Sequence, residues 1–248
     1  MGKDLLEIIA KCAMLLNGYG YPVLCVACIV MGILILIRKD NITKILGIWL
    51  VTSGVGSVFS LILQAVNSAT DGEASSWLSG IDNAVAAVVS FAVIITFYLY
   101  AKYSYGVRGL VALIIIKLSA IPANILFAAI SNAVSDNGFE TGYRMSYFRF
   151  AFILLFDIAV YVIIFLAYFK NRGKESHLPK LYLVPLLSII SKFINIICNV
   201  IFAFAGSGNG GLRDGVTLVM LIIADLFMFV FPAAGIYILR KGRKSVDG

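Results

Sequence analysis

Residues 182–206 read YLVPLLSIISKFINIICNVIFAFAG, an apolar run with a single charged side chain. Four of its polar residues, Ser188, Lys192, Asn195 and Asn199, are spaced four, three and four apart, which places them on one face of an α-helix. A lysine in the middle of such a run is costly in lipid, so we expect it to face protein or water. The stretch therefore predicts a transmembrane helix whose polar face points into a membrane protein.

The composition of the whole chain extends this prediction beyond one helix. Of the 248 residues, 61% are hydrophobic and 13% are charged, and the mean hydropathy is +0.98. A soluble domain typically has about 25% charged residues. So small a body cannot bury all this apolar surface, and the surplus must face lipid. We predict an all-α integral membrane domain over residues 21–239, with an amphipathic outer helix before it (residues 1–20) and a basic cytoplasmic tail after it (residues 240–248).

Seven stretches are long and apolar enough to cross a hydrocarbon layer of about 30 Å. They are residues 21–37, 45–66, 78–101, 109–131, 150–169, 182–206 and 216–239. Thirteen of the 20 basic residues fall in the segments on one side of these spans, five fall on the other side, and Lys117 and Lys192 lie within spans. The positive-inside rule then predicts a seven-transmembrane-helix bundle in a plasma-type (cytoplasmic) membrane, with the N-terminus outside and the C-terminus inside.

The net charge of +7 does not indicate a nucleic-acid partner, because the basic residues flank the spans. In that position they anchor helices to the anionic headgroups of the lipid bilayer. The chain has one histidine, His177, so it has neither an HExxH motif nor a multi-histidine metal site. No span contains a pair of carboxylates for acid–base catalysis. We therefore expect no catalytic residue, no metal and no cofactor, and we do not expect an enzyme.

Two local patterns predict how the first spans begin and pack. In residues 1–20 the charged residues lie opposite the leucines and isoleucines, and we expect Gly18, Gly20 and Pro22 to break this amphipathic helix before the first span. The second span carries small residues at a spacing that lets two helix backbones approach closely in lipid. These small residues are Ser53, Gly54, Gly56, Ser57 and Ser60.

The fourth and sixth spans resemble one another. Residues 117–128 align with residues 192–203 without a gap, and Lys, Ile, Asn, Phe and Ala coincide at a constant offset of 75. The span that follows each of them carries one acid, Asp157 or Asp225. These correspondences predict one leading helix followed by three helical-hairpin repeats, and internal repeats are common in transport folds. A chance likeness between apolar sequences is the alternative.

Charged groups at similar depth suggest a buried site. The helix rise places two lysines and two acids about 12 to 18 Å from the nearer edge of their spans. An unpaired ion at that depth is expensive, so we expect two buried ion pairs, Lys192–Asp225 and Lys117–Asp157, with nearby asparagines completing the hydrogen bonds. The candidate polar or ion site comprises Lys192, Asp225, Asn195, Asn199, Lys117, Asn124 and Asp157.

Two functions fit this pattern. The first is a small transporter or conduit for an ion or small polar solute, in which Asp157 and Asp225 couple ions or protons and Pro122 and Pro232 kink spans near the site. The second is a non-catalytic membrane subunit or receptor-like scaffold that binds partner membrane proteins, a second copy of the chain or a lipid-like ligand. The alternative to a functional site is a purely structural role, in which the ion pairs bind no ligand and only fix the register of the helices.

Overall fold

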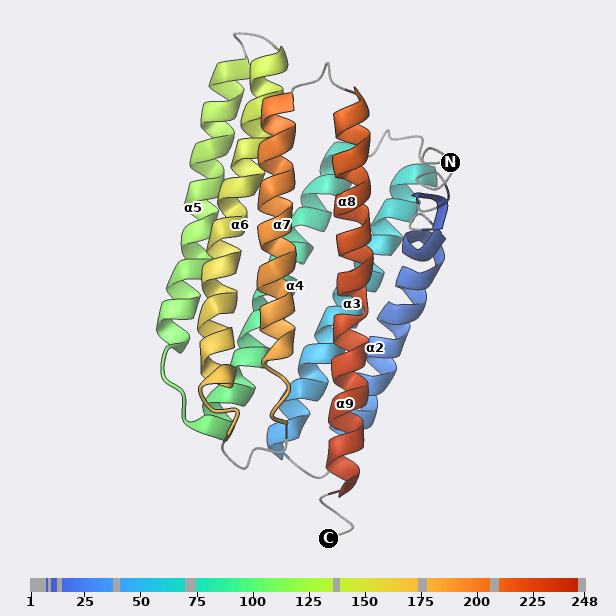
Figure 1. Cartoon of the computed structure of the whole chain (residues 1–248), viewed down its shortest axis with the longest axis vertical. Helices are drawn as coiled ribbons and strands as arrows, with labels where there is room; N and C mark the ends of the chain where they lie inside the picture. The colour runs from blue at the N-terminus through green and yellow to red at the C-terminus, as the bar shows by residue number, and fades with distance from the viewer. Residues whose placement is uncertain are drawn as a thin grey trace. The chain divides into compact units, whose positions relative to one another are not determined.

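The structure is a computed structural model that describes residues 8, 10–12, 15–37, 41–69, 75–135, 139–173, 178–205 and 210–244. Every regular element in these ranges is helical, as the composition predicted. In chain order the elements are a π-helical turn η1 (Leu16–Gly20), α2 (Tyr21–Leu36), α3 (Asn41–Ala69), α4 (Ser75–Tyr105), α5 (Leu110–Ser135), α6 (Phe139–Phe169), α7 (Leu183–Ala205), α8 (Gly210–Met228) and α9 (Val230–Lys244) (Figure 1).

Six helical stretches are long and apolar enough to cross a membrane. They are Gly18–Leu36, Asn41–Ala69, Gly80–Tyr105, Leu110–Ser131, Arg144–Phe169 and Leu183–Ala205. A helix pairs its own backbone N–H and C=O groups, which is why apolar runs of this length take helical form in lipid. These stretches correspond to the first six predicted spans, and the prediction of a multi-pass helical membrane protein is confirmed to that extent.

The seventh predicted span, residues 216–239, is not one continuous helix. The helix is interrupted at Phe229, between α8 and α9. Pro232 accounts for the interruption, because it has no N–H to donate to the carbonyl four residues earlier and its ring crowds that carbonyl. The next amide, that of Ala233, donates to the Phe229 carbonyl at 3.0 Å. The count of seven spans is therefore not confirmed, and neither is the orientation of the chain.

The helices divide into two compact units. One unit contains α5 to α8, and the other contains η1, α2, α3, α4 and α9. In the first unit α6 packs against both α5 and α7, and in the second α3 packs against both α2 and α4 while α9 packs against α2 (Figure 1). Each unit thus contains three consecutive helices packed in chain order. This grouping does not support one leading helix followed by three hairpin repeats.

Glycines allow α2 and α3 to pack with their backbones almost in contact. A Cβ atom added to Gly32 would lie 2.8 Å from the Gly47 carbonyl oxygen, and one added to Gly47 would lie 2.9 Å from that of Gly32. A Cβ atom added to Gly54 would lie 2.8 Å from the carbonyl oxygen of Cys25. Close packing through small residues of the second span is therefore confirmed, and the partner helix is α2 of the same chain.

The expected helix break before the first span is wrong. Leu16–Gly20 forms a π-helical turn that continues directly into α2, and the N–H of Tyr21 donates to the carbonyl of Leu16, five residues earlier. This wider turn shifts the hydrogen-bond register just before Pro22, which itself sits in the first turn of α2, where its missing N–H costs little. Half of the predicted outer helix (residues 1–7, 9, 13 and 14) lies outside the described residues.

Candidate functional site

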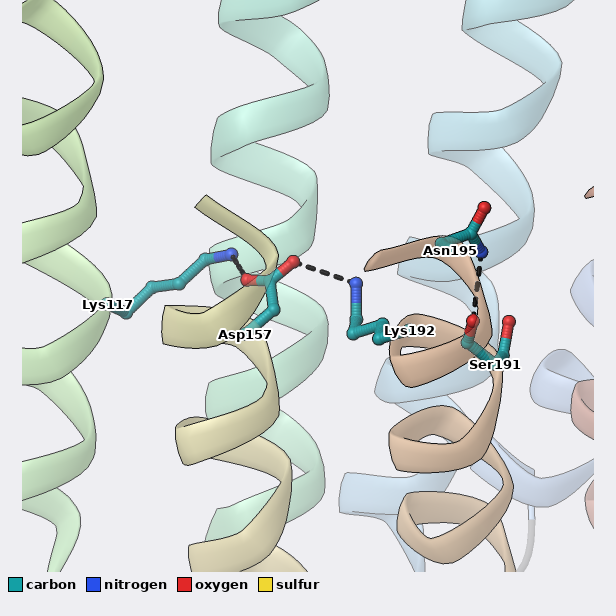
Figure 2. Close-up of polar contacts among 5 residues, drawn as sticks. All are labelled: Lys117, Asp157, Ser191, Lys192 and Asn195. Atoms are coloured by element: carbon teal, nitrogen blue, oxygen red, sulfur yellow. Dashed lines mark hydrogen bonds and ion pairs between the residues drawn. The ribbon is translucent and has the colours of Figure 1, made fainter. Parts of the chain in front are cut away.

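Three charged side chains meet within the α5–α8 unit. Lys117 comes from α5, Asp157 from α6 and Lys192 from α7 (Figure 2). One Asp157 carboxylate oxygen accepts a hydrogen bond from Lys117 Nζ at 2.6 Å, and the other accepts from Lys192 Nζ at 2.7 Å. Because α6 lies between α5 and α7, a short acid on α6 can be reached by a long lysine from each side. We call these three residues the charged triad.

The charge of the triad is unbalanced. Two ammonium groups share one carboxylate, which leaves a net charge of +1 at neutral pH. The side chains are 16% (Lys117), 17% (Asp157) and 23% (Lys192) exposed. The expectation of buried ion pairs is wrong in this respect, because the triad is half-buried. The physical reason is its position at the contacts of α5 and α7 with α6, since each lysine extends along a helix surface rather than through a closed core.

Sequence reasoning missed an aromatic neighbour of the triad. Lys192 Nζ lies 5.6 Å from the ring centroid of Tyr161, a distance at which a cation is attracted to the face of an aromatic ring. Tyr161 belongs to α6, so this contact links α6 to α7 beside the triad. It follows Asp157 by four residues, so the helical period itself placed it on the Asp157 face.

A second polar contact joins α5 and α6. Arg149 Nε donates to Asn124 Oδ1 at 2.7 Å, and both side chains are half-buried. Arg149 precedes Asp157 by eight residues and Asn124 follows Lys117 by seven, so this contact lies about two helical turns from the triad on the same faces. Asn124 was expected to complete the hydrogen bonds of a lysine, and no contact was predicted for Arg149. They bind one another because α5 and α6 run antiparallel, which brings these two positions to the same level.

Replacing Asn124 by alanine will test this contact. We expect the free energy of unfolding to fall by about 1.5 kcal/mol, because the half-buried Arg149 guanidinium loses an acceptor and hydrogen bonds to charged groups contribute roughly 1.5–3 kcal/mol. Ser119→Ala is the matched control on α5, since the Ser119 hydroxyl is exposed and donates only to the Ile115 carbonyl of its own helix. Equilibrium unfolding in mixed micelles measures both changes. Equal losses for the two variants would contradict a specific role for Asn124.

The asparagines of α7 do not join the triad. Asn195 Nδ2 donates to the Ser191 carbonyl at 3.0 Å, and Asn199 Nδ2 donates to the Asn195 carbonyl at 2.7 Å (Figure 2 shows the first of these). Their expected role in completing the hydrogen bonds of the ion pairs is therefore wrong. An asparagine side chain is short enough to bond to the preceding turn of its own helix, and that local bond is the one formed here.

The two predicted ion pairs have different outcomes. The contact between Lys117 and Asp157 is present as expected. Lys192 also contacts Asp157, whereas its expected partner was Asp225. Asp225 belongs to α8, but its side chain lies outside the described residues, as does the predicted Lys192–Asp225 pair. The sequence likeness of residues 117–128 and 192–203 thus corresponds to two lysines that share one acid, and their asparagines have different partners.

Comparisons with known proteins add no assignment. No protein-family model, no curated protein and no solved structure matches this chain. Among the described residues, no group of three or more histidine, cysteine, aspartate or glutamate side chains is placed to hold a metal ion. Apart from the membrane class that its helices indicate, the charged triad is therefore the feature from which a function must be argued.

Proposed function

We propose that the chain is a small multi-pass membrane transporter or conduit whose polar site is the charged triad. The observation that carries this proposal is an aspartate bound by two lysines from neighbouring membrane-spanning helices. Ionisable residues within spans are costly and usually mark a path for ions or solutes. The Arg149–Asn124 contact provides a further polar level on the same two helices. Asp157 and Asp225 are then the candidates for ion or proton coupling.

A purely structural role for the triad is the strongest competing interpretation. Ion pairs inside helix bundles can fix register without any ligand. One lysine paired with Asp157 would already fix the register of two helices, whereas a second half-buried ammonium group adds an excess charge that costs free energy. The second lysine on Asp157 therefore favours a site that an anionic ligand completes.

Solute flux across reconstituted vesicles tests the proposal. Lys192→Met leaves the neutral Lys117–Asp157 pair in place, so the variant is expected to fold while the site is altered. We expect the purified chain to carry at least one member of a panel of small cations, anions and neutral solutes faster than empty vesicles do. Lys192→Met should slow that flux about tenfold, which corresponds to about 1.4 kcal/mol of lost binding.

The matched control is Lys170→Met, which removes an exposed lysine just after the end of α6. Its flux should stay within about twofold of that of the unmodified chain. If no solute of the panel crosses faster than through protein-free vesicles, or if both lysine variants lose the same flux, the proposed function is wrong.

The finer topology belongs to the same proposal. We infer that the C-terminal end of the chain crosses the membrane a seventh time through α8 and α9, despite their interruption at Phe229. The excess of basic residues in the segments after α2, α4 and α6 supports an inner location for those segments in a cytoplasmic membrane. The N-terminus is then outside and the C-terminus is inside.

A non-catalytic membrane subunit or scaffold is the second candidate. The observation in its favour is the exposed apolar surface of α5. Only 6% of the most apolar 18-residue stretch of Leu110–Ser131 is buried by the rest of the chain. That surface would face lipid in a lone transporter and a partner membrane protein or a second copy in a complex. Purification from native membranes separates the two candidates. A stoichiometric partner favours the scaffold, whereas a lone species that carries solute favours the transporter.

A further inference from the structure

The two lysines of the triad are spaced to hold one carboxylate. Asp157 presents one oxygen to each ammonium at 2.6 and 2.7 Å, which is the distance range of strong charge-assisted hydrogen bonds. Its carboxyl group therefore fills the gap between Lys117 and Lys192. Any small carboxylate in that gap would make the same two contacts, since the carboxyl groups are chemically alike.

The triad also has unused capacity for an anion. An ammonium group has three N–H donors. In the part of the chain that the structure describes, Lys117 Nζ and Lys192 Nζ each donate to Asp157 and to no other residue. The net charge of +1 favours the entry of one negative charge. Between 16% and 23% of each side chain is exposed, so the triad is not sealed inside the packed helices.

We propose that Lys117 and Lys192 form a binding site for a small carboxylate anion, and that Asp157 is its tethered competitor. A free carboxylate binds when the Asp157 carboxylate leaves one or both lysines. This inference rests on the site of the proposed function and adds its substrate class. It also gives Asp157 a specific role, because this residue holds the site closed to anions as long as it remains ionised and in place.

Loss of the Asp157 charge is expected to strengthen anion binding. Without this resident negative charge, the net charge of the triad rises from +1 to +2 and a free anion is held more strongly. Among the described residues, the ionisable groups facing Asp157 are Lys117 from α5, Lys192 from α7 and Tyr161 from α6 itself. Asparagine at position 157 produces this loss of charge at constant pH.

Thermal unfolding of the purified full chain with different anions tests this site. The variant is Asp157→Asn, which removes the competing charge and keeps the shape of the side chain. We expect sodium acetate to raise its unfolding midpoint relative to a bulky sulfonate salt of the same ionic strength. Half-maximal stabilisation should need an acetate concentration at least about tenfold lower than in the unmodified chain. Asp157→Asn combined with Lys192→Met should lose the acetate effect, and Asp214→Asn, which removes an exposed acid of α8, should behave like the unmodified chain.

Equal effects of acetate and the sulfonate on Asp157→Asn would overturn the proposal, as would an acetate effect that survives in the double variant. If Asp157→Asn does not fold, broadening of the acetate NMR signal by the unmodified chain takes its place. We expect broadening by the unmodified chain and none with Lys192→Met, and broadening that Lys192→Met leaves unchanged would also overturn the proposal. Flux of cations or neutral solutes without any acetate binding would reject the carboxylate site alone, while acetate binding without flux of any solute would reject only transport.

Discussion

Replacing Asp157 by leucine will destabilise the protein more than removing either lysine of the triad. The substitution leaves two half-buried ammonium groups side by side with no negative charge between them. Removing one partner of a buried ion pair costs roughly 3–5 kcal/mol, and the partial exposure of the triad places the expected loss near the lower end, about 3 kcal/mol. Lys117→Met or Lys192→Met should cost only about 1 kcal/mol, because one lysine and Asp157 then remain as a neutral pair.

A double-mutant cycle measures the interaction between Asp157 and Lys192. In the Asp157→Leu background, Lys192→Met should raise the free energy of unfolding, because it removes one of two mutually repelling charges. In the unmodified chain the same substitution should lower it. Asp214→Leu is the control for loss of an acid in general and should change stability by less than about 0.5 kcal/mol. Equal losses for Asp157→Leu and Asp214→Leu, or an unchanged sign of the Lys192→Met effect, would contradict the shared carboxylate.

The second large effect is expected where α2 and α3 meet. A Cβ atom at position 32 would lie 2.6 Å from Val51 Cγ2, 2.8 Å from the Gly47 carbonyl oxygen and 2.9 Å from the Val51 amide nitrogen. Two of these three atoms belong to the backbone, so alanine fits only if the helices move apart. We expect Gly32→Ala to lower the free energy of unfolding by about 3 kcal/mol, at the upper end of typical overpacking costs, and Gly32→Leu to abolish folding.

Gly80→Ala is the matched control for this prediction. Gly80 is also a helical glycine, in α4, but an added Cβ atom would meet nothing within 4 Å. Alanine is favoured over glycine in a helix by about 1 kcal/mol, so this variant should be slightly more stable than the unmodified chain. Unfolding midpoints in one detergent mixture allow the comparison. If Gly32→Ala is as stable as Gly80→Ala, the close approach of α2 and α3 is wrong.

The helices were the most predictable part of this protein. Runs of hydrocarbon side chains must pair their backbone groups internally in lipid, and this requirement acts locally along the chain. For this reason six predicted spans coincide with helices. The span that is not confirmed, residues 216–239, was predicted from apolarity alone. The effect of Pro232 on the carbonyl four residues earlier is equally local, and it was predicted only as a kink rather than as an interruption between α8 and α9.

The partners of the charged residues were less predictable. Helix rise placed the lysines and Asp157 at comparable depths, and they do meet. Depth does not say which helix lies beside which, and the hairpin scheme assigned one acid to each lysine. In the structure α6 packs between α5 and α7, so Asp157 is within reach of both. The asparagine contacts were missed for a related reason, because a short amide side chain has acceptors in its own helix as well as across the interface.

The central claim is that the two lysines of the triad bind the same carboxylate, and solid-state NMR of the chain in lipid bilayers tests it most directly. With ¹⁵N in the lysine ammonium groups and ¹³C in the aspartate carboxyl groups, we expect short nitrogen–carbon distances, under about 4 Å, for both Lys117 and Lys192. Both couplings should disappear in Asp157→Asn. A Lys192 coupling that survives in Asp157→Asn, as pairing with Asp225 would produce, or the absence of either coupling from the unmodified chain, would contradict the account.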